Sequence, residues 1–400
     1  MPWFLRMTLT LFPIIFLVQI YVFLGVKFSL REIWSSHQKK WNVLFWSVLL
    51  FFNIFPLTVI VLYLFGQIYS LYIFKLEINL LDFMFSFPFW WGMISTVEIL
   101  PYFVLIDILF LFVRRLKSQF SWPRIRAITK IALILLIFFY VGIRLYIDTY
   151  QVRLSENKIH FNDIPNAFDG LRITLVGDIQ VDRYTQEKKL NTLQKHIRVS
   201  NSDLLFFSGD LVTNGQYYID QGLATICSFT ANTAKIACIG DHDFWANPRK
   251  ISQGMSSCGW SFLRNSHQIV SWKGQTILIT GITEIYSKKM SSMDLSDILS
   301  QAPEADFKIL LLHQPSPRLI DIAVQYGYHL ILAGHTHGGQ IQFKPFGKTL
   351  TPSMLETPYF SGLYHMGETV VAVTNGIGLT LAPVRYRAAA EITLLTIYSQ

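Results

Sequence analysis

Long apolar stretches dominate the first part of the chain. Four of them are long enough to cross a bilayer as helices, which takes roughly 20 residues each. No small-x-small cleavage site follows the first stretch, so it is predicted to remain as a helix. The pattern predicts an all-α membrane module of four transmembrane helices in residues 1–150, at positions 7–26, 43–65, 88–113 and 128–147.

The pattern changes after residue 150. Short apolar runs of strand length alternate with mixed segments of helical length, which is typical of a layered α/β domain. Residues 151–400 are therefore predicted to form such a domain. Strands are expected at 171–177, 204–208, 235–239, 276–281, 308–312, 329–333, 340–343, 369–374 and 391–397. Helices are expected at 186–198, 217–231, 246–257 and 316–326.

The positive charge belongs to the membrane module. Residues 1–150 hold 13 Lys+Arg and 6 Asp+Glu, a net of +7, and residues 151–400 hold 21 and 20, a net of +1, which together give the +8 of the chain. The nearly neutral α/β domain predicts no nucleic-acid-binding surface, which would need a basic patch. The three cysteines show no CxxC spacing and are expected to be buried thiols without a disulfide framework.

The loops between the apolar stretches predict the orientation in the membrane. Loop 27–42 carries four basic residues and one acid, loop 114–126 carries five basic residues and no acid, and the middle loop has only Lys75. The positive-inside rule places the two basic loops in the cytoplasm, and the α/β domain then faces the extracytoplasmic side. Inside the third stretch, Glu98 is expected either to bond between helices or to serve a ligand or ion, and Asp107, near one end, is expected to reach the membrane interface.

Five predicted strands end in acids or histidines. An aspartate after a strand is commonly just a turn or capping residue, so each position alone says little. Ligands at the carboxyl ends of neighbouring strands converge in space, however. Carboxylates and imidazoles without a thiolate suit Mn²⁺, Fe, Zn²⁺ or Mg²⁺. The ordered set is Asp178, Gly209-Asp210, the GDHD run at 240–243, His313 and the GHTHGG run at 334–339.

This order of motifs resembles the calcineurin-like metallophosphoesterase superfamily, and in particular its bacterial membrane-associated, YkuE-like branch. The closing stretch GIGLTLAPVRYRAAAEITLLTI is similar to the end of that branch, and the resemblance covers roughly residues 165–400. It implies a two-sheet sandwich flanked by helices with two divalent metal ions at the strand ends. One ion would be held by Asp178, Gln180, Asp210 and His337, and the other by Asp210, Asp241, His313 and His335.

The resemblance also implies the remaining roles. His242 matches the general acid, with Asp243 orienting it, and Arg385 would bind a substrate phosphate or, equally, tie the last strands together. Two metal ions clamp the attacking and leaving oxygens of a displacement on phosphorus, and a histidine held in place can protonate the leaving group.

The chain departs from the family pattern at two positions. Gln180 stands where histidine is usual, and Asp241 stands where asparagine is usual. An amide oxygen makes the site harder and favours Mn²⁺, with Mg²⁺ next, over Zn²⁺. Asp241 adds a third carboxylate to a site with two dications, so the formal charge of the two-metal site falls from +2 to +1. We therefore expect a diester or pyrophosphate substrate rather than a highly charged monoester.

The sequence thus predicts a multi-pass protein of the bacterial cytoplasmic membrane that is a metal-dependent phosphoesterase. Its expected partners are membrane lipids and a phosphodiester or pyrophosphate substrate, such as a lipid or envelope intermediate. No nucleic acid is expected as a partner, and the sequence does not predict the oligomeric state. Two alternatives remain. One is a cytoplasm-facing nucleotide-sugar–lipid pyrophosphatase, and the other is a metal-binding pseudoenzyme that acts as a membrane sensor.

Overall fold

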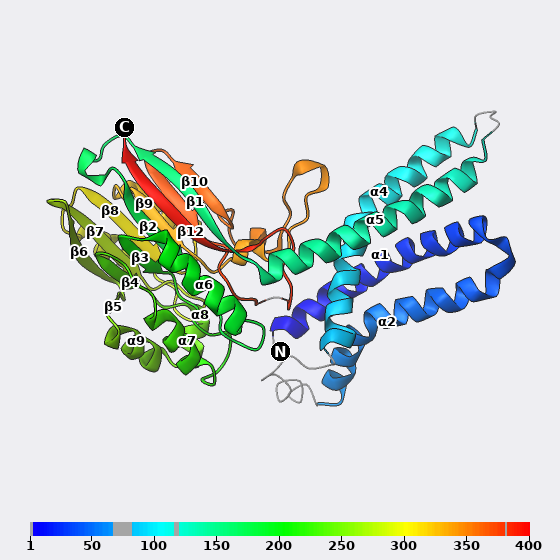
Figure 1. Ribbon diagram of the computed structural model, residues 1–400, viewed down its shortest axis with the longest axis horizontal. Helices are drawn as coiled ribbons and strands as arrows, with labels where there is room; N and C mark the ends of the chain where they lie inside the picture. The colour runs from blue at the N-terminus through cyan, green and yellow to red at the C-terminus, as the bar shows by residue number, and fades with distance from the viewer. Residues whose placement is uncertain (1–2, 67–81, 116–119, 381) are drawn as a thin grey trace. The chain divides into compact units, whose positions relative to one another are not determined.

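The computed structural model describes residues 3–66, 82–115, 120–380 and 382–400. The chain forms two compact units (Figure 1). The first unit is Met1–Tyr146 together with two short later segments, Phe343–Thr349 and Leu381–Val384. The second unit comprises Ile147–Gln342, Leu350–Thr380 and Arg385–Gln400.

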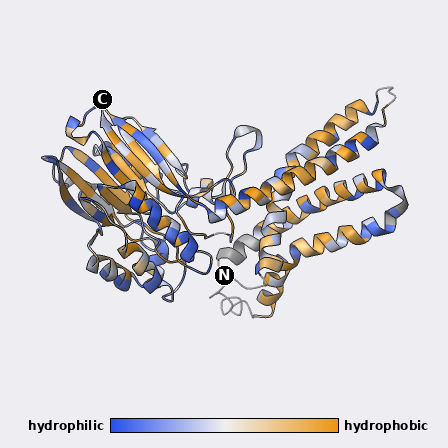
Figure 2. Ribbon diagram, in the orientation of Figure 1, coloured by the Kyte–Doolittle hydropathy of each residue, from blue (hydrophilic) through white to orange (hydrophobic). Residues whose placement is uncertain are grey.

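In the described part of the first unit there are four long helices, as the apolar pattern predicts. They are α1 (Trp3–Ile33), α2 (Gln38–Leu64), α4 (Phe87–Val113) and α5 (Trp122–Tyr150), and each is long and apolar enough to cross a membrane. Figure 2 shows hydrophobic residues along the length of these helices. Lys75 and Lys117, which contribute to the predicted loop charges, lie outside the described residues.

Polar contacts join helices α1, α4 and α5. The Asp107 carboxylate lies 2.6 Å from Lys130 Nζ and 3.8 Å from Arg126 Nη1, and it accepts a 2.7 Å hydrogen bond from Tyr21. A charge inside a membrane is costly unless it is paired. Asp107 therefore bonds between helices, a role that its place near one end of the apolar stretch does not indicate.

The first sheet of the second unit has the strand order β1-β12-β2-β3-β4-β5. All neighbouring strands are parallel except β12 and β2. The strands are β1 (Val152–Phe161), β2 (Leu171–Val176), β3 (Leu204–Phe207), β4 (Ala234–Ala237), β5 (Trp260–Phe262) and β12 (Ala390–Ser399).

The second sheet has the order β10-β11-β9-β8-β7-β6. Its three central pairings are parallel and its two outer pairings are antiparallel. The strands are β6 (Ser266–Trp272), β7 (Gln275–Ile282), β8 (Phe307–Leu312), β9 (Leu330–Ala333), β10 (Gly362–Met366) and β11 (Thr369–Val373).

Strand β3 is apolar at every position because it is buried on both faces. Leu204 and Phe206 belong to a core shared by both sheets, whereas Leu205 and Phe207 face a second core under the helices. A strand that is covered on both faces needs apolar residues at every position. The resulting two-sheet sandwich is flanked by α6 (Glu187–Ser200), α7 (Ile219–Cys227), α9 (Pro248–Ser257), α10 (Ser292–Ser300) and α11 (Pro317–Gln325).

Two sequence-based expectations are wrong. Residues 340–343 form no strand: Ile341 makes an isolated bridge to Tyr386, which also exchanges backbone hydrogen bonds with Gln340 and Gln342. Cys227 and Cys258 form a disulfide, whereas only Cys238 is a free, buried thiol. The two bonded cysteines are 31 residues apart and meet because α7 packs beside α9, which local spacing does not reveal.

Candidate metal centre

The seven predicted metal ligands lie in loops that follow strands of both sheets. Asp178 and Gln180 follow β2, Asp210 follows β3, and Asp241 follows β4 as the first residue of the short helix α8 (Asp241–Ala246). His313 follows β8, and His335 and His337 follow β9. All of them are buried except His335, which is partly exposed.

The backbone at this site is unusual. Five of these residues have positive φ angles: Asp178 (49°), Gln180 (44°), Asp210 (62°), His335 (72°) and His337 (53°). Residues with a side chain rarely adopt this conformation, and it persists only when the surrounding structure enforces it. Such strain is concentrated at functional sites, so the finding agrees with a site built for chemistry.

Two glycines let the loops approach one another closely. A Cβ atom at Gly240 would lie 2.1 Å from Asp210 Oδ1, and one at Gly334 would lie 2.5 Å from Asp178 Oδ2. Any side chain at either position would displace a ligand. Gly240 of the GDHD run and Gly334 of the GHTHGG run are therefore required by close packing around the carboxylates.

One group of possible ligands consists of Asp241, His313 and His335. Asp241 Oδ2 lies 3.4 Å from His313 Nε2 and 3.3 Å from His335 Nδ1. The His313 Nδ1 atom lies 2.7 Å from the Ser208 carbonyl oxygen, which fixes the ring and turns Nε2 towards the carboxylates. The donor atoms lie close enough together to bind one ion.

A second group consists of Asp178, Asp210 and His313. Asp210 Oδ2 lies 3.4 Å from His313 Nε2, and His337 Nε2 lies 3.7 Å from Asp178 Oδ1. His313 thus takes part in both groups.

Gln180 adds a possible metal ligand, its side-chain amide oxygen, to this second group. Its Nε2 donates to Asp210 Oδ2 at 3.3 Å. Its Oε1 is buried and has no hydrogen-bond partner among the described residues. An unpaired buried amide oxygen is unfavourable, and a divalent cation would satisfy it. The residues present therefore fit a two-metal centre.

The electrostatics favour positive charge at the centre. Burial opposes the charged form of every group here, yet His313 and His242 hold the pKa of Asp210 below its usual range. The neighbouring carboxylates likewise outweigh burial at His313 and raise its pKa well above the ordinary value. Burial and Arg385 lower the pKa of His337, so that ring is neutral, as a metal ligand must be.

His242 lies beside the centre with its ring oriented by the backbone. Its Nδ1 forms a hydrogen bond with the Thr213 carbonyl oxygen, and its Nε2 lies 4.0 Å from Asp210 Oδ2. Asp243 accepts hydrogen bonds from the backbone N–H groups of Asp210 at 2.8 Å and Leu211 at 2.7 Å. The contact that orients His242 therefore comes from Thr213, and Asp243 shapes the Asp210 loop.

Arg385 is fully buried. Its guanidinium donates to the backbone carbonyl oxygens of His337 (3.0 Å), Gly378 (2.8 Å), Ala388 (2.9 Å) and Asn375 (2.8 Å). With its donors used in this way, Arg385 holds the His337 loop against the segment that precedes β12. This geometry favours the second of its two expected roles, the structural tie.

Sequence reasoning missed several residues around the ligands. Gln314 Nε2 donates to Asp241 Oδ2 at 2.6 Å, and the backbone N–H of Tyr286 donates to Asp241 Oδ1 at 2.6 Å. Glu356 Oε2 lies 3.2 Å from His335 Nε2, and Glu356 Oε1 accepts a hydrogen bond from the Tyr286 hydroxyl. Only Gln314 had a signal in the sequence, because it directly follows His313.

Such a donor set, gathered from both sheets of a sandwich, defines a hydrolase that works with two divalent metal ions. A model of the calcineurin-like phosphoesterase family matches residues 171–339. The uncharacterised metallophosphoesterase YkuE of Bacillus subtilis is 30% identical over 262 residues, which cover 64% of this chain and 90% of that protein. The chain belongs to the calcineurin-like metallophosphoesterase family and is a phosphoester hydrolase.

Two further relatives are matched over a smaller share of their own length than YkuE is. A zebrafish transmembrane protein with a metallophosphoesterase domain is 27% identical over 250 residues, which cover 60% of this chain and 56% of that protein. An uncharacterised metallophosphoesterase of Helicobacter pylori strain J99 is 25% identical over 246 residues, covering 61% of this chain and 63% of that protein.

Proposed function

We propose that this chain is a membrane-anchored phosphodiesterase or pyrophosphatase whose substrate carries an apolar group, such as a lipid or a lipid-linked envelope intermediate. The observation that supports it is an exposed apolar rim beside the metal centre. The Trp245 ring lies 5.2 Å from the His242 ring, and the Tyr286 ring lies 5.2 Å from the His335 ring. Leu355, next to Glu356, is 88% exposed.

This rim suits an amphiphilic substrate. Trp245 is 53% exposed and Tyr286 is 48% exposed, so apolar surface faces solvent directly around the two histidines. Exposed apolar residues that gather at one place mark a binding surface. A phosphoester with an apolar tail would bury the rim while its phosphorus reaches the ligands.

The site residues divide the chemistry among them. The proposed ligands would hold two divalent ions, which polarise the phosphoryl oxygens and activate the attacking water. His242 would donate a proton to the leaving oxygen from Nε2, since its Nδ1 is engaged by Thr213. Gln314 and the Tyr286 N–H would keep Asp241 ionised and aligned.

The charge of the centre supports a substrate with little charge per phosphorus. Burial opposes ionisation of Asp241, but hydrogen bonds to His313 and His335 outweigh it and hold its pKa far below the usual range. Three ionised carboxylates then face the two metal ions, which attracts a dianionic monoester less than a monoanionic diester. The oxygen of Gln180 favours Mn²⁺ as the metal.

Two observations support an extracytoplasmic active site. The predicted cytoplasmic loops are the basic ones. The disulfide between Cys227 and Cys258 lies in the second unit, and disulfides persist mainly in oxidising compartments outside the cytoplasm.

The test uses the full chain in detergent with Mn²⁺. We expect hydrolysis of bis-p-nitrophenyl phosphate to exceed that of p-nitrophenyl phosphate, and EDTA to abolish both. Asp210→Asn should remove activity, whereas Asp220→Asn, at an exposed position on α7, should retain it. A clear preference for the monoester would contradict the diester proposal.

A second arm tests the apolar rim. Trp245→Ala with Leu355→Ser should raise KM roughly tenfold for a phosphatidylglycerol substrate in mixed micelles and leave KM for bis-p-nitrophenyl phosphate unchanged. Tyr217→Ala, at another exposed aromatic residue, is the matched control. Equal effects on the lipid and the soluble diester would refute the role of the rim.

A further inference from the structure

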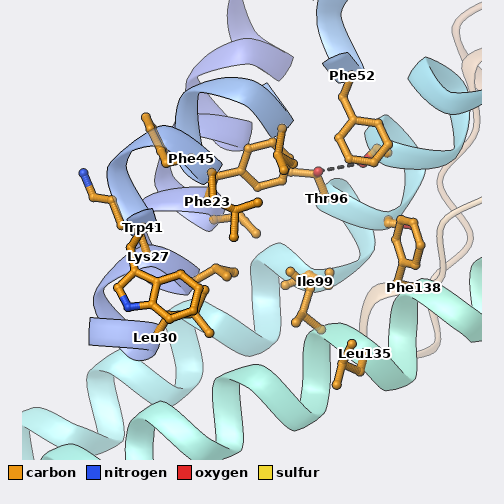
Figure 3. A pocket seen from close by; sticks show the side chains of 17 residues that line it. Phe23, Lys27, Leu30, Trp41, Phe45, Phe52, Thr96, Ile99, Leu135 and Phe138 are labelled. Carbon is orange, nitrogen blue, oxygen red and sulfur yellow. Dashed lines mark hydrogen bonds between the residues drawn. The ribbon is translucent and has the colours of Figure 1, made fainter. Parts of the chain in front are cut away.

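Residues of the membrane helices line a partly open cavity that the hydrolytic reaction does not use (Figure 3). Its volume is about 230 Å³, and residues of α1, α2, α4 and α5 all line it. The walls are almost entirely aliphatic and aromatic, and in the described part of the chain no carboxylate lines them. Room for the cavity comes partly from small residues of α4, namely Gly92, Ser95 and Thr96.

The cavity has one cationic end. In Figure 3, Lys27 and Trp41 lie towards one end, and Phe52 and Phe138 lie towards the other. Lys27 Nζ lies 4.7 Å from the centre of the Phe45 ring, a cation–π contact that keeps the ammonium at the apolar wall. Lys39 and Lys40 line an adjoining pocket that shares Leu44 with the cavity. An occupant should therefore be apolar along its length and anionic at one end.

The buried hydroxyl of Ser95 also points to a ligand. Ser95 is only 3% exposed, and its Oγ has no hydrogen-bond partner within the part of the chain that the structure describes. The adjacent Thr96 instead donates to the Gly92 carbonyl oxygen at 2.6 Å. Burying an unpaired hydroxyl in an apolar setting is costly. A ligand with an ester carbonyl would supply the missing acceptor.

We propose that this cavity binds one acyl chain of an anionic glycerophospholipid. The chain occupies the apolar cavity, an ester carbonyl accepts from Ser95, and the phosphate headgroup pairs with Lys27. Lys39 and Lys40 add to the positive surroundings of the headgroup. Lys27 lies near the end of α1, in the stretch 27–42 that the positive-inside rule places on the cytoplasmic side, so the lipid comes from the cytoplasmic leaflet. This site is independent of the proposed substrate.

The test is native mass spectrometry of the full chain in detergent, titrated with phosphatidylglycerol or phosphatidylcholine of matched acyl chains. The wild type should bind phosphatidylglycerol roughly fivefold more tightly than phosphatidylcholine. Lys27→Gln should remove this preference, and Arg124→Gln, at an exposed basic residue of the other predicted cytoplasmic loop, should keep it. Equal binding of both lipids by the wild type would overturn the proposal.

A cavity-filling variant tests the place of binding. Val48→Trp should weaken binding of both lipids at least tenfold, while Leu50→Trp, at a position of α2 that does not line the cavity, should leave binding unchanged. Ile99→Phe fills the same cavity from α4 and replaces Val48→Trp if that variant fails to fold. Wild-type lipid binding by a folded cavity-filling variant would also overturn the proposal.

Discussion

At the scale of single residues, the two departures from the family pattern are connected through shared contacts. Gln180 Nε2 donates to Asp210 Oδ2, and that oxygen lies 3.4 Å from His313 Nε2. The same His313 atom lies 3.4 Å from Asp241 Oδ2. Residues joined by a shared network act non-additively when they are changed.

The first prediction is that the two departures compensate each other. Gln180→His and Asp241→Asn should each lower kcat/KM with Mn²⁺, whereas the double variant should recover activity and bind Zn²⁺ more tightly. The coupling free energy should be about 0.5–3 kcal/mol, the range found for residues in one network. Steady-state kinetics of the four proteins with each metal measure it. Additive losses would show that the two changes are independent.

The second prediction concerns His242 as a proton donor. His242→Ala should lower kcat by about 10²–10⁴ for a diester with an alkyl leaving group, because an alkoxide needs a proton as it departs. The loss should be much smaller for a nitrophenyl ester, whose leaving group is stable without one. His160→Ala, at an exposed histidine of β1, is the control. A loss of the same size on both substrates would exclude the role.

The third prediction follows from a buried lysine. Burial, and secondarily the Arg385 charge, lower the pKa of Lys189 to about 7, and its Nζ has no hydrogen-bond partner among the described residues. The ordinary pKa of lysine is 10.5, so between pH 7 and that value Lys189 is protonated in the unfolded chain and mostly neutral in the folded chain. The free energy of unfolding should therefore rise with pH in this window, by up to about 1.4 kcal/mol per pH unit.

Lys189→Met tests this effect directly. The variant should be more stable than the wild type at pH 7 and should lose most of the gain between pH 7 and pH 9, measured as the urea midpoint of the full chain in detergent. Lys188→Met, at the exposed neighbouring position, should behave as the wild type does. An unchanged pH dependence in Lys189→Met would rule out this residue as the cause.

At the scale of elements, the sequence predicts best those strands whose two faces are both covered. Strand β3 is a continuous apolar run, and strands β2 and β8 are apolar except at Arg172, Thr174 and Lys308; the ends of all three carry ligands in the expected order. Strand β1 was missed because its residues alternate irregularly between buried and exposed positions. Residues 340–343 alternate between polar and apolar side chains as a strand does, but they form only an isolated bridge with Tyr386, a residue distant in sequence.

The environment of the ligands depends on contacts that no local pattern contains. Glu356 and Tyr286 are hydrogen-bonded although they are 70 positions apart in the sequence, and Tyr286 and Asp241 are hydrogen-bonded although they are 45 positions apart. The sequence singles out Arg385, but whether it binds substrate or backbone carbonyl oxygens depends on its burial, which follows from the packing of the loops and not from the sequence pattern. Composition and spacing predict which residues gather, and tertiary packing decides what each one does.

The fourth prediction concerns the link between α7 and α9. Replacing Cys227 and Cys258 by serine should lower the stability of the second unit by about 2–4 kcal/mol, because a cross-link restricts the unfolded chain. Thermal unfolding with and without reductant measures the effect. Reductant should destabilise the wild type and leave the double variant unaffected, and Ser256→Ala on α9 should respond as the wild type does. A wild type insensitive to reductant would contradict the prediction.

At the scale of the whole molecule, a single cut near residue 150 does not separate the two units. Phe343–Thr349 and Leu381–Val384 belong with the helices, although they lie within the sequence of the second unit. The first follows the GHTHGG motif and the second immediately precedes Arg385. The helical unit thus includes segments that are close in sequence to the metal ligands, and each experiment therefore uses the full chain.

The fifth prediction tests the side of the membrane on which the catalytic unit lies. Two independent observations, the basic loops 27–42 and 114–126 and the disulfide, support the extracytoplasmic side. A tag after Gln400 should therefore be digested by protease added to intact spheroplasts. In the same cells, Cys227 and Cys258 should be oxidised, seen as resistance to an alkylating reagent until reductant is added. A protected tag together with reduced cysteines would instead support the cytoplasm-facing pyrophosphatase, because both signals depend on the same topology.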